Sequence, residues 1–99
     1  MAFSVVVNAN IAELIFSKPP VNAFDSTEWA AIASSLETLG RDDEVHVIVV
    51  RAEGRGFCAG VDIKELAADS NKILSVNKGN YDTFAAIHRN PKPVIVALH

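Results

Sequence analysis

The sequence has very little cysteine and no long apolar run, and both shortages restrict the class of protein it encodes. Cys58 is the only cysteine among 99 residues, so no disulfide can form within the chain. This suits a reducing compartment, and we expect a cytoplasmic location. The longest purely apolar runs are five residues, far fewer than the roughly 20 that a membrane-spanning helix needs. The N-terminal residues also lack the basic start and apolar core of a secretory signal. We therefore expect a soluble chain with no membrane partner.

An excess of basic residues is also missing. Nine Lys and Arg residues face twelve Asp and Glu residues, which gives a net charge of −3. Nucleic acid is therefore not expected as the main partner. His46, His88 and His99 have no cysteine or carboxylate at metal-ligand spacing, so no metal site is predicted. The apolar fraction of 49% and the charged fraction of 21% are typical of one small globular domain.

Residues 45–66 are the stretch around which the rest of the sequence is organised. The β-branched run at 47–50 is typical of a strand buried on both faces. Three glycines then mark a loop over 54–60. Asp62 follows as a predicted helix N-cap, with Glu65 at capping-box spacing. A strand, a glycine-rich loop and a helix start in this order aim backbone N–H groups at an electron-rich ligand oxygen.

The segments before this stretch predict a hairpin and a helix. Residues 3–7 and 11–16 read as antiparallel strands joined by Asn8, Ala9 and Asn10. Asn22, in the loop that follows, is interpreted as a turn residue whose side chain bonds local backbone.

Asp25 and Glu28 predict a second capping box, flanked by Phe24 and Trp29 as a hydrophobic staple. Gly40 is the predicted C′ residue of this helix. Trp29 is interpreted as a core residue rather than a platform for a ligand. The predicted apolar face of the helix comprises Trp29, Ile32, Ala33, Leu36 and Leu39.

The last third of the sequence is less regular. Residues 67–77 show no sustained period and are expected to be the most mobile part. A helical face follows at Tyr81, Phe84, Ala85 and His88, and Pro91 and Pro93 end that helix. Residues 94–98 form a second fully apolar strand. The chain stops one residue after this strand, which leaves unfinished the strand end at which α/β proteins build their sites. We therefore interpret the chain as truncated or as one half of an assembly.

The glycine loop formally matches a dinucleotide-binding fingerprint. Residues 54–59 fit G-x-G-x-x-A after a strand. The acidic residue expected about 20 positions later is absent, because residues 75–78 are Ser-Val-Asn-Lys. No Gly-Lys-Ser/Thr follows either, which argues against a Walker loop. The glycines alone therefore predict only a tight loop.

Four segments together resemble the enoyl-CoA hydratase/isomerase, or crotonase, superfamily. They are KPPVNAF at 18–24, VIVV at 47–50, GRGFCAGVDIKEL at 54–66 and PKPVIVALH at 91–99, in the family's order. The resemblance covers the whole of this chain but only the N-terminal portion of the proteins in that family. It implies an α/β fold, with residues 1–99 forming the N-terminal part of a single crotonase-like domain with a ββα spiral core.

The resemblance also implies an acyl-CoA site in which two backbone N–H groups stabilise a thioester enolate. The residue after the Ala-Gly pair, Val61, matches the first donor, and the second is expected in a turn beyond residue 99. Ala23 matches a residue that lines the CoA pocket, and Lys64 lies where the family often has a cation near the phosphates. The implied substrate-binding residues are Ala23, Ala59, Gly60, Val61, Asp62, Ile63 and Lys64.

The acid and base groups of the family lie later in the chain, and Asp62, Glu65 and Asp69 match none of them. Asp62 is expected to cap a helix in preference to contacting substrate. Cys58 has no visible partner that would make it a nucleophile. Coenzyme A enters only as part of the substrate, and no separate cofactor is predicted.

Hydration of a 2-enoyl-CoA is the expected reaction, and isomerase, CoA hydrolase or decarboxylase chemistry are the alternatives within the family. The resemblance further implies a homo-oligomer, a trimer or a hexamer. A non-catalytic module that needs a complementary C-terminal segment remains the alternative of a different class.

Overall fold

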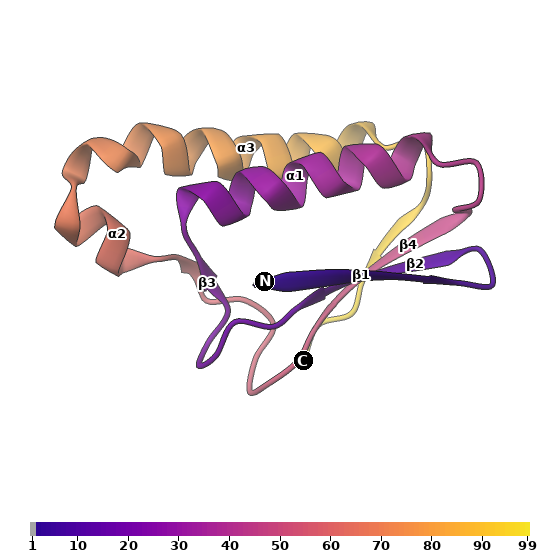
Figure 1. Ribbon diagram of the computed structural model, residues 1–99, viewed down its shortest axis with the longest axis horizontal. Helices are drawn as coiled ribbons and strands as arrows, with labels where there is room; N and C mark the ends of the chain where they lie inside the picture. Colours follow the sequence, from indigo (N-terminus) through magenta and orange to yellow (C-terminus); the bar gives the residue numbers. More distant parts are fainter. Residues whose placement is uncertain (1) are drawn as a thin grey trace.

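The computed structural model describes residues 2–99. Two long helices lie side by side on one face of a four-stranded sheet, and a short helix stands at one end (Figure 1). The sheet has the order β1-β2-β4-β6; β1 and β2 are antiparallel, and the other pairs are parallel. Its strands are β1 (Phe3–Asn8), β2 (Ile11–Phe16), β4 (Val47–Ala52) and β6 (Val94–Val96). The other elements are β3 (Ala23–Phe24), α1 (Ser26–Arg41), β5 (Gly60–Val61), α2 (Ile63–Ala68), a 3₁₀ turn (Ser70–Lys72) and α3 (Ile73–Arg89).

The predicted N-terminal hairpin is confirmed. Asn8 pairs with Ile11, and the two residues between them, Ala9 and Asn10, have left-handed φ values of 53° and 67°. Two left-handed central residues match the twist of antiparallel strands, which is why such turns favour Asn. The Asn10 amide also donates to the Glu44 carbonyl at 2.8 Å, which ties the hairpin turn to the segment before β4.

Helix α1 begins as its sequence predicts. The Asp25 carboxylate accepts the Glu28 N–H at 2.8 Å, and the Glu28 carboxylate accepts the Asp25 N–H at 2.9 Å. This reciprocal pair satisfies two otherwise free donors. The predicted end is wrong, because the helix runs to Arg41 and Asp42 is its C-cap. Gly40 instead allows close packing, since a Cβ there would lie 2.9 Å from Asn90 Oδ1.

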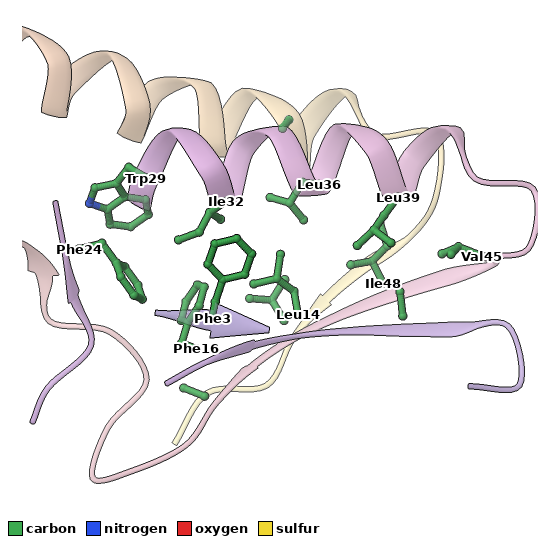
Figure 2. Packing of buried hydrophobic residues seen from close by; sticks show 14 residues of the cluster. Phe3, Leu14, Phe16, Phe24, Trp29, Ile32, Leu36, Leu39, Val45 and Ile48 are labelled. Atoms are coloured by element: carbon green, nitrogen blue, oxygen red, sulfur yellow. The ribbon is translucent and has the colours of Figure 1, made fainter. Parts of the chain in front are cut away.

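The core lies between α1 and the sheet (Figure 2). The predicted apolar face of α1 is buried, and Trp29, only 5% exposed, is a core residue as interpreted. The Phe24 and Trp29 rings meet edge to face with centroids 5.4 Å apart, so the predicted staple also forms. The residues of this cluster that Figure 2 labels are Phe3, Leu14, Phe16, Phe24, Trp29, Ile32, Leu36, Leu39, Val45 and Ile48.

Two predicted strands are less buried than expected. In β4, Ile48, Val50 and Ala52 are buried, but the alternate residues are only half-buried. The two long helices cover one face of the sheet, so burial on both faces is wrong for the described residues. The strand predicted over 94–98 is three residues long, and Ile95, on this open edge, is 55% exposed.

Residues 67–77 are mostly helical although their sequence lacks a clear period. The following helix is confirmed and ends before Pro91, but its predicted face is not the packed one. Tyr81 and Phe84 are 64% and 60% exposed. The buried residues of α3 are Val76, Gly79, Thr83 and Ala86. Within residues 2–99, no helix is both long and apolar enough to cross a membrane.

Candidate functional site

The glycine loop and the loop after β2 meet at the carboxyl end of the sheet. Short strands β3 and β5 pair in parallel, with Ala23 opposite Gly60 and Phe24 opposite Val61. The Asp62 N–H donates to the Phe24 carbonyl at 2.8 Å. Successive residues of a strand direct their N–H groups to opposite edges. The Val61 N–H therefore points away from β3. The pairing of β3 with β5 also makes direct neighbours of the two sequence segments that carry the predicted site, 18–24 and 54–66.

Two glycines of the loop have backbone conformations that other residues rarely adopt. Gly54 has a φ of 97° and Gly60 a φ of 109°. Both values lie in the region that glycine reaches without steric cost. Gly60 thus turns the chain into β5 directly before the candidate donor.

Helix α2 begins as predicted, but without the capping box. The Asp62 carboxylate accepts the Lys64 N–H at 2.9 Å, so Asp62 is the N-cap. The Asp62 N–H is already used by β3, and the Glu65 carboxylate turns elsewhere. It accepts the Ser26 N–H at 2.9 Å and the Ser26 hydroxyl at 3.0 Å. Glu65 therefore fastens α2 to the first residue of α1.

Most of the predicted substrate-binding residues line one pocket of about 330 Å³. Its wall also contains Lys18, Pro19, Pro20 and Val21, so the loop after β2 forms one side and the start of α2 the other. Gly60 is the one predicted substrate-binding residue that does not line this pocket. The predicted residues that line it are Ala23, Ala59, Val61, Asp62, Ile63 and Lys64.

A second, mainly apolar pocket of about 450 Å³ lies against the same loop. Gly60 and Ala59 belong to its wall, and Ala59 is shared with the first pocket. Residues 59–61 therefore lie between a pocket with lysines on its wall and a pocket of apolar side chains. Those side chains come from β2, α1, β4, the loop, α3 and the C-terminal segment, and include Phe16, Trp29, Phe57, Phe84, Val96 and Leu98.

The two lysines of the first pocket differ in their surroundings. The Lys18 ammonium hydrogen-bonds the Glu28 carboxylate and lies 3.6 Å from the Asp62 carboxylate. Burial acts to lower the pKa of Lys18, but the hydrogen bond and these charges outweigh it and leave the pKa raised. Lys64 is exposed and belongs to none of the ion pairs formed among residues 2–99. The positive charge of Lys64 is thus not neutralised by a carboxylate of the described residues, and it is available to an anionic ligand in this pocket.

Cys58 has the properties of an unreactive thiol. Burial raises its pKa, and a hydrogen bond from the Gly60 backbone offsets only part of that effect. The nucleophile is the thiolate, so a raised pKa lowers reactivity at neutral pH. The described part of the chain contains no group of three His, Cys, Asp or Glu residues placed to hold a metal ion.

Asn22 has a larger role than its sequence context suggests. It is 3% exposed, and its Nδ2 lies within 3.2 Å of three carbonyl oxygens, those of Gly56 and Phe57 in the glycine loop and of Glu53 directly before it. The interpretation as a turn residue with local contacts accounts only for the Lys18 N–H, which donates to Asn22 Oδ1 at 2.7 Å. A polar residue between Val21 and the apolar Ala23-Phe24 pair was the available signal.

Known proteins match the chain over nearly its whole length. A family model described as Enoyl-CoA hydratase/isomerase matches residues 6–99. The (7aS)-7a-methyl-1,5-dioxo-2,3,5,6,7,7a-hexahydro-1H-indene-carboxyl-CoA hydrolase of Rhodococcus jostii (strain RHA1) is 43% identical over 83 residues, which are 82% of this chain and 32% of that protein. A probable enoyl-CoA hydratase of Bacillus subtilis (strain 168) is 35% identical over 101 residues, or 99% and 39% of the two chains.

The fold is matched equally well by solved structures. A putative enoyl-CoA hydratase from Streptomyces coelicolor A3(2) superposes with a TM-score of 0.86 at 30% identity, over 100% of this chain and 38% of its own. The chain therefore spans less than half the length of these proteins, and its mixed α/β fold is the one that the resemblance predicts.

Proposed function

The chain belongs to the enoyl-CoA hydratase/isomerase family, and on that premise we propose that the complete protein is an acyl-CoA enzyme whose Val61 N–H stabilises a thioester enolate. The observation that carries this proposal is the pairing of β3 with β5. It leaves the Val61 N–H free of the β3 partner, two residues after Ala59, which lines both adjoining pockets. A thioester carbonyl bound there would have its CoA portion in one pocket and its acyl chain in the other.

The chemistry of each pocket fits that division. The pocket of Ala23, Ala59, Asp62 and Ile63 carries exposed Lys64 on its wall, and an ammonium group suits a phosphate. The opposite pocket is lined mainly by aromatic and aliphatic side chains, which suit an acyl chain. A separate cofactor is not part of this proposal.

A backbone amide suits an enolate because its dipole is fixed before the reaction starts. Negative charge develops on the thioester oxygen, and a preorganised donor stabilises it without reorganisation. The Val61 side chain takes no part in this interaction. We propose that the second donor and the acid and base groups belong to the part of the complete protein beyond residue 99. The described segment then supplies binding and half of the oxyanion hole.

Hydration of a 2-enoyl-CoA is the reaction we propose first, supported by the relative named as a probable hydratase. Hydrolysis of a cyclic carboxyl-CoA is a second candidate, because the carboxyl-CoA hydrolase of Rhodococcus jostii is 43% identical. Assaying the complete protein with 2-butenoyl-CoA and with the bicyclic thioester separates them. A homo-oligomer and a cytoplasmic location stay predictions, and a non-catalytic module would turn over neither substrate.

Substitution of Val61 tests the proposed donor. In the complete protein, Val61→Ala keeps the N–H, so activity should stay near wild type. Val61→Pro deletes the N–H, and turnover should fall about 10²–10³-fold, as when one oxyanion-hole donor is lost. Proline also restrains Gly60, so unfolding midpoint and CoA affinity are measured on the same variants.

An ester in place of the Val61 amide removes the hydrogen with little change of shape, and serves if Val61→Pro does not fold. A folded, CoA-binding protein that lacks this N–H and keeps wild-type turnover would refute the role of Val61.

A further inference from the structure

Asn22 holds an unusual number of contacts for one buried amide. Its backbone is left-handed, with a φ of 57°, and its side chain is almost fully buried. Nδ2 lies 3.1, 3.0 and 3.2 Å from the carbonyl oxygens of Glu53, Gly56 and Phe57. These three oxygens converge on one point, where they would repel one another if no donor were present.

The amide is the donor that allows this convergence. An Asn side chain has two N–H hydrogens and one accepting oxygen. Here the two hydrogens serve three acceptors, and Oδ1 accepts the Lys18 N–H at 2.7 Å. Nearly all the donors and acceptors of the side chain are thus engaged in hydrogen bonds to the loop after β2 and to the segment that contains the glycine loop. Loss of the donor would leave several buried acceptors unsatisfied.

The same residue also holds the far end of the glycine loop, through its main chain. The Ala59 N–H donates to the carbonyls of Val21 and Asn22, at 3.0 and 3.3 Å. The next residues along both segments are Ala23 and Gly60, which pair as the start of β3 and β5. Side chain and main chain of Asn22 therefore fix the first and last parts of the loop that leads to Val61.

From this geometry we propose that Asn22 is a positioning residue that sets the direction of the Val61 N–H, an inference that rests on the proposed function of Val61. Asn22 lines none of the three pockets to whose walls residues 59–61 contribute. It acts through the loop and does not touch the acyl-CoA. Because catalysis depends on donor placement at the ångström scale, its loss should lower turnover more than binding.

Two substitutions of Asn22 separate the side chain from the backbone. Asn22→Gly removes the amide and keeps a residue that accepts left-handed φ. Asn22→Asp keeps the shape but replaces the donor with an oxygen that faces three carbonyls. The chain offers a matched control in Asn10, which is also left-handed and donates its amide to a backbone carbonyl, that of Glu44. Asn10 lies in the hairpin turn and lines neither pocket.

The test uses the complete protein with 2-butenoyl-CoA as the probe. For both Asn22 variants we expect kcat to fall about 10²-fold with KM within about threefold of wild type. Asn10→Gly and Asn10→Asp should leave both constants unchanged. The infrared C=O stretch of the bound thioester reports polarisation by the donor. Its shift to lower frequency should shrink in the Asn22 variants and persist in the Asn10 controls.

Each result decides a defined question. Asn22 variants with wild-type kcat and carbonyl shift overturn the positioning role and leave the proposed function intact. A wild-type protein that turns over neither 2-butenoyl-CoA nor the bicyclic thioester, and shifts the carbonyl of neither, overturns the proposed function, and this inference with it. The assays are run at a temperature where the variants are folded, and if neither Asn22 variant folds at any temperature, Asn22 serves general stability and the positioning role is overturned.

Discussion

Lys64 is the residue whose chemistry is simplest to test, because the described chain gives its ammonium group no carboxylate partner. If it binds a CoA phosphate, Lys64→Glu in the complete protein should weaken binding of a CoA thioester more than binding of a thioester that ends at pantetheine. A charge-assisted contact contributes roughly 1.5–3 kcal/mol when well formed, and less when solvated. Calorimetric titration with both ligands measures the difference.

The matched control is Lys72→Glu, which reverses a charge on the 3₁₀ turn outside the pocket. It should affect both ligands little and equally. Equal losses for the two ligands on Lys64→Glu would make Lys64 an ordinary surface residue of α2.

At the scale of elements, Gly79 decides how closely α3 approaches α1. A Cβ at this position would lie 2.9 Å from Trp29 Cβ and 3.3 Å from the Ala30 backbone nitrogen. Alanine in a helix normally stabilises by about 1 kcal/mol relative to glycine. Here overpacking should outweigh that gain, and Gly79→Ala should lower the free energy of unfolding by about 1–3 kcal/mol. Urea titration of the complete protein checks the sign.

Gly40→Ala is the comparison within α1. Its added methyl group meets the end of the Asn90 side chain, which is held only by hydrogen bonds to the Leu36 carbonyl and the Lys92 N–H, whereas Gly79 faces a core residue and backbone. Gly40→Ala should therefore cost less. A Gly79→Ala protein that is more stable than wild type would show that the two helices separate without penalty.

These two helices also show which features of the fold could be predicted from the sequence. The start of α1 was predictable because Asp25 and Glu28 lie three residues apart and act locally. The packed face of α3 was not, because Gly79 and Thr83 are not large apolar residues. Their burial depends on a partner helix about fifty residues earlier, where the Thr83 hydroxyl lies 3.1 Å from the Trp29 carbonyl.

For the candidate site too, local motifs were predictable and contacts between distant segments were not. The pocket residues from Ala59 to Lys64 were found because a contiguous motif carries them. The role of Asn22 was missed because its three acceptors lie more than thirty residues away along the chain. The capping box at Asp62 failed for a related reason, since Ser26 competes for the Glu65 carboxylate only in the folded protein.

For the whole molecule, one face of the sheet remains open. Val6, Ile11 and Ile95 lie on this face and are 46%, 44% and 55% exposed. We expect the isolated 99-residue chain to associate through it, and to show no enoyl-CoA turnover, because we propose that the second oxyanion donor and the acid and base groups lie beyond residue 99. Analytical ultracentrifugation and an activity assay test both statements.

Ile95→Lys should reduce this association, whereas Tyr81→Lys, on the exposed side of α3, should not. A 99-residue chain that is monomeric, unfolds cooperatively and hydrates 2-butenoyl-CoA would contradict the expectation.

The strand order β1-β2-β4-β6 also has a consequence for the time course of folding. The hairpin needs only a two-residue turn, so it forms on the microsecond scale. Each parallel pairing waits for a helical crossover, because Ile11 pairs with Val47 and Ile48 with Val94. Loop closure over such separations is slow. We therefore expect the sheet to grow from the N-terminal hairpin outward, so that on a ribosome its first two strands can pair before the last has been synthesised.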